Sequence, residues 1–175
     1  MLFRSVSPKR LAQMQARLRR YDYAERIKCA VVDAAVATSD ERFDLILCDV
    51  PCSGTGTLAA NPEIRHRLKV EDLARQAERQ KLILAAALKR LAPGGRLVYS
   101  TCSLEPEECE QVVEAVVAGS GVRRIEVGPL MAKLEDQGVL RRDAELSSAV
   151  RDGAMRTLPG VHGCDGFFAV VLKRD

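Results

Sequence analysis

Two short segments carry a cysteine among small and polar residues, a combination suited to nucleophilic chemistry. In the first, DVPCSGTG over residues 49–56, Asp49 follows an apolar run and Cys52 comes three residues later. In the second, YSTCS over residues 99–103, Cys102 stands at the end of another apolar run. A thiol among hydroxyl groups packs a core poorly, whereas a thiolate is a strong nucleophile. We therefore expect reactive thiols at both places.

Strands must position these segments. Residues 43–48 (FDLILC) and 96–101 (RLVYST) have the pattern of buried strands, and proline at position 51 cannot donate to a sheet ladder, so the first must end there. A third strand is expected over residues 26–32, ending near Asp33. Asp33, Asp49 and Cys102 then all lie at strand ends, which is where ligands bind in α/β folds.

The rest of the chain alternates between helical and strand patterns. Ser7 and Pro8 are typical of a helix start, with a hydroxyl N-cap and proline at the first helical position. A long amphipathic helix is expected over residues 71–91, ended by Pro93-Gly94-Gly95. Further expected elements are a helix over 106–117, a strand over 122–127, a loop with one or two short elements over 129–157, and a strand over 166–174. This alternation predicts one α/β domain with a mostly parallel sheet.

Composition narrows the class of protein. The 175 residues carry a net charge of +3, and 47% of them are hydrophobic, as in ordinary globular domains. No apolar run is long enough to cross a bilayer and no secretion signal is visible, so we expect a cytoplasmic protein without a membrane partner. Basic residues cluster within 9–20 and 65–69, which fits either a solvated helix face or a phosphate-contacting surface.

The six cysteines argue against several kinds of site. None forms a C-x-x-C pair, and the two histidines lie far from any cysteine cluster with zinc-finger spacing, so no metal is expected. A disulfide framework is not expected without a secretion signal. The cysteines outside the two segments are interpreted as buried packing residues: Cys29, Cys48, Cys109 and Cys164.

The two cysteine segments resemble the Sun/Fmu family of RNA cytosine-carbon-5 methyltransferases, which carry a D-x-P-C-S-G-x-G block and a T-C-S block separated by a helix and a P-G-G turn. The resemblance extends over most of the chain, to residues 61–65 (NPEIR), Gln80, residues 83–108, Leu158-Pro159 and residues 165–168 (DGFF). It implies a Rossmann-like, S-adenosyl-L-methionine-dependent methyltransferase fold, truncated at its N-terminus, with residues 1–175 forming part of the catalytic domain.

The resemblance also implies roles for individual residues. Cys102 would add covalently to carbon 6 of cytosine, which makes carbon 5 nucleophilic enough to take a methyl group. Asp49 would bond the base near nitrogen 3, and Cys52 would assist removal of the carbon 5 proton or release of the adduct. In DNA cytosine methyltransferases the proline-cysteine motif supplies the nucleophile, so Cys52 remains the alternative nucleophile. Asp33 and Asp49 are the acids expected at the cofactor, although Asp33 alternatively only ends a strand.

Two departures from the family concern the cofactor. The glycine-rich cofactor loop and the first strand of the family would precede position 1, and Ser5 stands where the family segment opens with an aspartate that binds the ribose. Because that strand lies in the middle of the sheet, we expect its neighbours to close the gap, expose an edge, or pair with another copy or a partner chain. We therefore expect weak or no S-adenosylmethionine binding by the chain alone.

Two functions stay open at this point. One is methylation of cytosine carbon 5 in RNA, ribosomal RNA in particular, through a covalent Cys102 adduct. The other is a degenerate domain that binds RNA without turnover, which Ser5 and the lost loop favour and the two intact cysteine motifs disfavour. A thiol redox protein is disfavoured because the chain has no C-x-x-C pair.

Overall fold

The computed structural model describes residues 2–22, 24–36, 40–141 and 147–175. The chain forms two compact units, residues 1–40 and residues 41–175, each with a sheet of its own. That residues 1–175 belong to one catalytic domain stays a prediction. Among the described residues, no helix is long and apolar enough to cross a membrane.

The unit of residues 1–40 pairs two short strands in parallel and connects them through a helix. The elements are β1 (Leu2–Ser5), α1 (Pro8–Leu18), η1 (Ala24–Arg26) and β2 (Lys28–Val31). The predicted helix start is confirmed, because the Ser7 hydroxyl accepts a hydrogen bond from the backbone N–H of Arg10 and Pro8 takes the first helical position. The strand expected over 26–32 is present but shorter, and Asp33 follows it by two residues.

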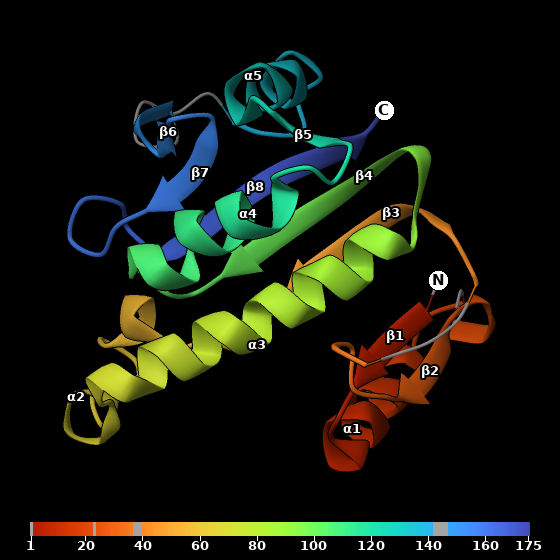
Figure 1. Cartoon of the computed structure of the whole chain (residues 1–175), viewed down its shortest axis with the longest axis horizontal. Helices are drawn as coiled ribbons and strands as arrows, with labels where there is room; N and C mark the ends of the chain where they lie inside the picture. The colour runs from red at the N-terminus through yellow and green to blue at the C-terminus, as the bar shows by residue number, and fades with distance from the viewer. Residues whose placement is uncertain (1, 23, 37–39, 142–146) are drawn as a thin grey trace. The chain divides into compact units, whose positions relative to one another are not determined.

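The unit of residues 41–175 is built on a six-stranded sheet with helices against it (Figure 1). Along the sheet the strand order is β3-β4-β8-β7-β6, and β5 also pairs with β8. The strands are β3 (Phe43–Asp49), β4 (Leu91–Thr101), β5 (Val122–Ile125), β6 (Val150–Arg151), β7 (Ala154–Thr157) and β8 (Phe167–Arg174). The helices are α2 (Ile64–Arg67), α3 (Val70–Lys89), α4 (Glu110–Val117) and α5 (Val127–Asp136), with short 3₁₀ turns η2 (Thr55–Thr57) and η3 (Pro106–Glu108).

The α/β class is confirmed, but the expectation of a mostly parallel sheet is wrong. Only β3 and β4 pair in parallel in this sheet, whereas β8 runs antiparallel to β4, β5 and β7. The reason is the length of the connections: a parallel pair needs a long crossover, such as α3 between β3 and β4. The nine residues between β7 and β8 only reverse the chain direction.

Two further boundaries differ from the expectations. The long helix already ends at Lys89, and Leu91 pairs with Phe43, so the Pro93-Gly94-Gly95 turn bulges from the start of β4 instead of ending the helix. The segment 129–157, expected as a loop with one or two short elements, holds most of the ten-residue helix α5 as well as the short strands β6 and β7. Helix α5 was missed because a glycine and a proline stand in its first turn, and only Val127 and Met131 are buried in it.

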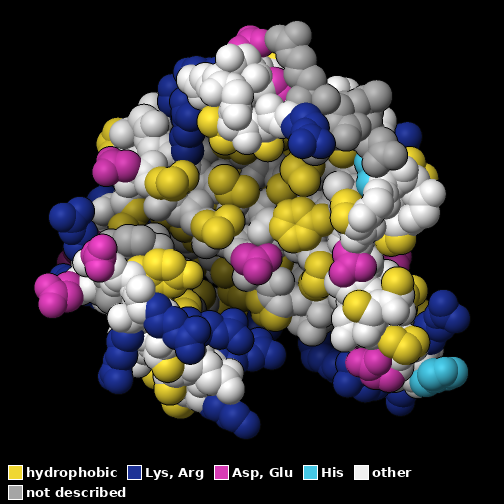
Figure 2. Space-filling view, turned by 180° about the vertical axis from the view of Figure 1, so that it is seen from behind, with side chains coloured by type: hydrophobic (Ala, Val, Ile, Leu, Met, Phe, Trp, Pro, Cys, Tyr) yellow, Lys and Arg dark blue, Asp and Glu magenta, His cyan; other side chains and the backbone are white. Residues whose placement is uncertain are grey.

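The core of the larger unit lies between the sheet and helices α3 and α4, which cover one face (Figure 1). Buried side chains from the two helices and the sheet line this core: Leu84 and Leu88 of α3, Val112 and Val113 of α4, Leu97 and Tyr99 of β4, and Leu172 of β8. Figure 2 shows the molecule from behind, where hydrophobic side chains stay in view. Leu45 and Leu47 on β3 are each 69% exposed.

Candidate active site

The two cysteine segments leave the same edge of the sheet. Strand β3 ends at Asp49 and strand β4 ends at Thr101, so Cys102 is the first residue after β4. Because these strands are parallel, with Asp49 opposite Ser100, both loops start side by side at their carboxyl ends. The Ser100 hydroxyl donates to an Asp49 carboxylate oxygen at 3.1 Å, which links the two strand ends. The predicted convergence of Asp49 and Cys102 is thus present.

The two Cys-Ser dipeptides then lie against each other. The sulfur atoms of Cys52 and Cys102 are 3.2 Å apart, and the hydroxyl oxygens of Ser53 and Ser103 are also 3.2 Å apart. The backbone N–H of Gly56 donates to the carbonyl of Cys102 at 2.9 Å. Two thiols separated by 50 positions in the chain are therefore held at hydrogen-bond distance by the contacts of the residues next to them.

The buried side chain of Glu108 holds the loop that carries Cys52 in this arrangement. Glu108, which is fully buried, accepts hydrogen bonds from the backbone N–H of Ser53 at 2.9 Å, from the Ser53 hydroxyl, and from the Gln80 amide at 3.0 Å. The same Gln80 amide group donates to the Pro51 carbonyl at 2.9 Å, and the Tyr99 hydroxyl donates to the Glu108 carbonyl at 2.7 Å. A buried charge needs such donors, so these residues fix the loop that carries Cys52.

The sequence did not indicate this support, because Glu108 stands simply within the helix expected over residues 106–117. The informative signal is at Gln80, which shares the buried stripe of α3 with Ala77 and Leu84 at helical spacing. A polar side chain on an apolar helix face needs a polar partner, and Glu108 is that partner.

The proximity of the sulfurs affects their protonation. The pKa of Cys52 is lowered to about 7, chiefly because a hydrogen bond from Cys102 stabilises its thiolate, aided by hydrogen bonds from Thr101 and the Gly54 backbone. The pKa of Cys102 is raised, first because it supplies that hydrogen bond and next because of burial. Near neutral pH Cys52 is therefore the thiol of the pair that ionises first, while Cys102 keeps its proton.

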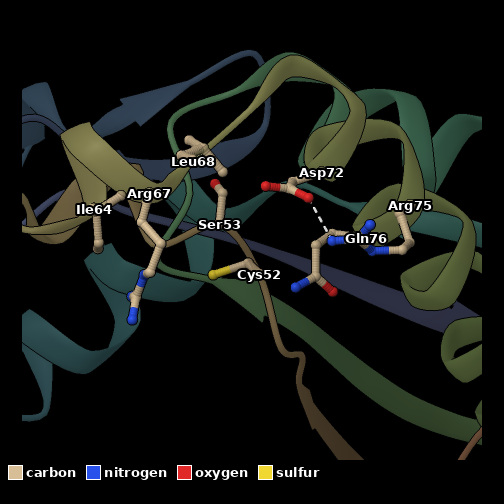
Figure 3. Close-up of a pocket in the computed structure, with 8 residues that line it drawn as sticks. All are labelled: Cys52, Ser53, Ile64, Arg67, Leu68, Asp72, Arg75 and Gln76. Atoms are coloured by element: carbon tan, nitrogen blue, oxygen red, sulfur yellow. Dashed lines mark hydrogen bonds and ion pairs between the residues drawn. The ribbon is translucent and has the colours of Figure 1, made fainter.

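A cavity of about 180 Å³ opens beside Cys52 (Figure 3). Its other walls come from Ser53, from α2 with the residue after it, and from the first turns of α3; they include Ile64, Arg67, Leu68, Asp72, Arg75 and Gln76. Arg75 is ion-paired with Asp72. Arg67, from the basic cluster predicted at 65–69, thus lines a cavity that reaches one of the two thiols. In the part of the chain that the structure describes, no group of three or more His, Cys, Asp or Glu side chains could hold a metal.

Comparison with known proteins decides the family. A family model described as 16S rRNA methyltransferase RsmB/F matches residues 3–173. The chain belongs to this family. The resemblance to Sun/Fmu methyltransferases inferred from the motifs is thereby confirmed.

Individual relatives agree with the family. The chain is 31% identical over 95% of its length to ribosomal RNA small subunit methyltransferase B of Vibrio cholerae, and 35% identical over 77% to the probable methyltransferase B of Bacillus subtilis. The structure of PH0851 superposes with a TM-score of 0.82, and that of NSun6 from Pyrococcus horikoshii with SFG with a TM-score of 0.77; each is 26% identical and covers 99% of this chain. The chain spans about a third of the curated relatives, 34% of the Vibrio protein, and 36% and 41% of the two solved chains. The methyltransferase fold is therefore confirmed.

The DGFF segment at residues 165–168, near the C-terminus, has a structural role at the site. The backbone N–H of Gly166 donates to the Gly56 carbonyl at 2.8 Å, and a Cβ atom on Gly56 would lie 2.4 Å from the Gly166 carbonyl oxygen. Only glycine therefore allows this backbone contact beside Cys102. Phe168 is fully buried and packs edge-on against Tyr99, so it is a core residue.

The remaining predicted site residue belongs to the other unit. Asp33 follows β2, and one of its carboxylate oxygens accepts a hydrogen bond from the backbone N–H of Ala35 at 3.0 Å. This is a local turn contact, typical of an aspartate that ends a strand. A cofactor role for Asp33 stays a prediction.

Proposed function

We propose that this chain carries the base-modifying residues of an enzyme that methylates carbon 5 of cytosine in ribosomal RNA, with S-adenosyl-L-methionine as methyl donor. The observation that carries the proposal is the 3.2 Å contact between Cys52 and Cys102 beside Asp49, at the carboxyl edge of β3 and β4. Membership of the RsmB/F family supports ribosomal RNA as the substrate class. The target base must leave its stack to reach the thiols, as base-modifying enzymes require.

The first step is activation of the nucleophile. Cys102 carries the proton of the pair, and passing it across 3.2 Å to the Cys52 thiolate leaves a thiolate on Cys102. That thiolate forms a bond to carbon 6, while the carboxyl group of Asp49 hydrogen-bonds the base and stabilises the electron density that develops in the ring. Asp49 is exposed at the end of β3, so a base can reach it.

The second step removes the proton from carbon 5 after methylation. Cys52 must first release the proton that it took from Cys102, because only its thiolate can act as a base again. It can then accept the carbon 5 proton, the double bond re-forms, and Cys102 leaves carbon 6 as a thiolate. The two cysteines thus divide addition and elimination between them.

The residues proposed to hold S-adenosyl-L-methionine fit it in part. When bound, this cofactor supplies an electrophilic methyl group on a sulfonium. Asp49 lies at the carboxyl end of β3, where ligands bind in such folds. Ser5, at the position of the family's ribose-binding aspartate, has no carboxylate, and its hydroxyl accepts a hydrogen bond from the Ser7 backbone N–H. This mismatch favours the alternative, an RNA-binding domain without turnover.

A covalent trap distinguishes the two functions. Small-subunit ribosomal RNA containing 5-azacytidine is incubated with the chain and S-adenosyl-L-methionine, then separated on a denaturing gel. We expect an adduct that is lost by at least about 10³-fold in Cys102→Ser, because the nucleophile is removed, and retained in Cys164→Ser, a change at an exposed cysteine. Cys52→Ser should trap adduct on ordinary RNA as well. Reversible binding without any adduct supports the RNA-binding domain instead.

A further inference from the structure

The six cysteines differ in their surroundings. Cys48 and Cys109 are buried, and burial raises the pKa of each thiol to about 12, so both stay protonated and inert. Cys29 is half-buried, and Cys164 is exposed, so the interpretation of Cys164 as a buried packing residue is wrong; neither has a thiol as hydrogen-bond partner among the described contacts. Cys52 and Cys102 are half-buried and lie in contact with each other. They alone combine access for a small reagent with a neighbouring thiol.

From this geometry we propose that Cys52 and Cys102 form an oxidisable dithiol, a site at which a peroxide converts the two active-site thiols into one reversible intramolecular disulfide. Their sulfur atoms are 3.2 Å apart, so a disulfide bond requires them to approach by only about 1.2 Å. Rotation about the two side-chain bonds supplies such a movement without separating the loops.

The surrounding contacts hold the two loops in place for this reaction. Next to the sulfurs, the Ser53 and Ser103 hydroxyls are in contact, the Gly56 N–H binds the Cys102 carbonyl, and Glu108 holds the Ser53 backbone. A thiol pair held in this way reacts within the chain far faster than with a second molecule. A sequence test for C-x-x-C cannot detect it, because 50 positions separate the two cysteines.

The chemistry proceeds in two balanced steps. The Cys52 thiolate attacks one oxygen of the peroxide, the O–O bond breaks, and Cys52 becomes a sulfenic acid as hydroxide leaves. The Cys102 sulfur then attacks the Cys52 sulfur, the S–O bond breaks, and the hydroxyl departs as water with the proton of Cys102. In total two thiols are oxidised and one peroxide is reduced to two molecules of water. The cavity beside Cys52 gives a small peroxide access to the first sulfur.

The disulfide would switch the site off. It leaves no thiolate for addition to a base and no free Cys52 to accept a proton, and a small thiol reductant restores both. Oxidation at Cys52 alone would continue to sulfinic acid and become irreversible. Capture by Cys102 therefore also protects the site from permanent damage.

Peptide mapping of the oxidised chain tests the proposal. The purified chain is treated with hydrogen peroxide at pH 7, its remaining thiols are alkylated, and it is digested with trypsin without reduction. Cys52 lies in the tryptic peptide 43–65 together with Cys48, and Cys102 lies in 97–123 together with Cys109. We expect these two peptides to be linked by one disulfide bond, which lowers the mass of the chain by two hydrogens. Cys164 should be recovered in its alkylated form. Dithiothreitol should restore both peptides.

Single variants assign the bond and keep the test independent of methyl transfer. Cys48→Ala and Cys109→Ala should still form the linked peptides, whereas Cys52→Ser and Cys102→Ser should not. In Cys102→Ser the sulfenic acid on Cys52 should instead accumulate and react with dimedone. Linkage through Cys48 or Cys109, or sulfinic acid at Cys52 with Cys102 still alkylatable, overturns the proposal. So does oxidation of Cys164 ahead of the pair.

Discussion

The two units of this chain contrast in how firmly each holds its predicted functional residues. In residues 41–175, the site is supported by three fully buried side chains that bond one another: Gln80, Tyr99 and Glu108. In the described part of residues 1–40, only Leu11 is buried. There, Ser5 and Asp33 each accept a hydrogen bond from a backbone N–H two residues further along the chain. The two cysteines and Asp49 thus lie on a unit with an extensive buried core, whereas Ser5 and Asp33 lie on a unit with little core of its own.

Hydrogen exchange gives the largest expected difference between the units. A two-stranded sheet covered by one short helix is marginally stable, while β4 and β8 lie inside a six-stranded sheet. Backbone amides of β2 should therefore exchange at least about 10²-fold faster than those of residues 97–100 in β4, after correction for intrinsic rates. Equal protection of the β2 and β4 amides from exchange would show that the units unfold as one. The proposed difference in stability between the units would then be wrong.

Glu108→Ala should strongly destabilise the larger unit. Its removal leaves the Ser53 N–H, the Ser53 hydroxyl and the Gln80 amide without their buried acceptor, at a cost of about 3 kcal/mol in the free energy of unfolding. Urea denaturation measures the change. The matched control is Glu107→Ala, because Glu107 is an exposed acid one position away and its removal should have little effect. A similar small effect for both variants would contradict the role given to Glu108.

Gly56→Ala should have a smaller effect on stability but a direct one on the thiols. Its Cβ would meet the carbonyl oxygens of Gly166 at 2.4 Å and Cys102 at 2.7 Å, so the backbone must shift, at a cost of about 2 kcal/mol. Because the shift moves Cys102 away from Cys52, alkylation of Cys52 should need higher pH than in the wild type. Gly128→Ala is the control, since its Cβ would make only ordinary contact, at 3.6 Å, with Val150. If the pH dependence of Cys52 alkylation is the same in Gly56→Ala as in the wild type, the glycine contact does not position the thiol pair.

Ser5→Asp should give the smallest effect, a gain in cofactor affinity. A carboxylate at the end of β1 could bond the ribose hydroxyls, and one charge-assisted hydrogen bond is worth about a tenfold gain. Calorimetry with S-adenosyl-L-methionine compares the wild type, expected to bind weakly, with Ser5→Asp and with the uncharged Ser5→Asn. Low-micromolar binding by the wild type would refute the expectation of weak binding, and equal affinities for all three would show that position 5 does not contact the cofactor.

Much of the architecture was predictable because it depends on local patterns. Ser7-Pro8 marks a helix start through its own hydroxyl and ring, and the apolar runs at 43–48 and 167–172 form β3 and β8, although β3, expected to be buried, is mostly exposed. Strand direction was not predictable from these patterns, since β8 becomes antiparallel only through its pairing with β4 and β7. The helix α5 was missed for the related reason that two buried residues make a weak periodic signal.

The sequence by itself determined the family and the candidate residues. The types and spacing of the residues in DVPCSGTG and YSTCS are chemical properties of the chain, and they identified Asp49, Cys52 and Cys102 without coordinates. Only the tertiary structure decided how the thiols share a proton, because a pKa depends on the 3.2 Å between two sulfurs that are 50 positions apart. It also decided that Glu108 is a buried support and not a surface acid, since burial follows from the packing of α3 and α4 on the sheet. Residue type limits the chemistry that a chain can perform, and distance and burial select which part of it takes place.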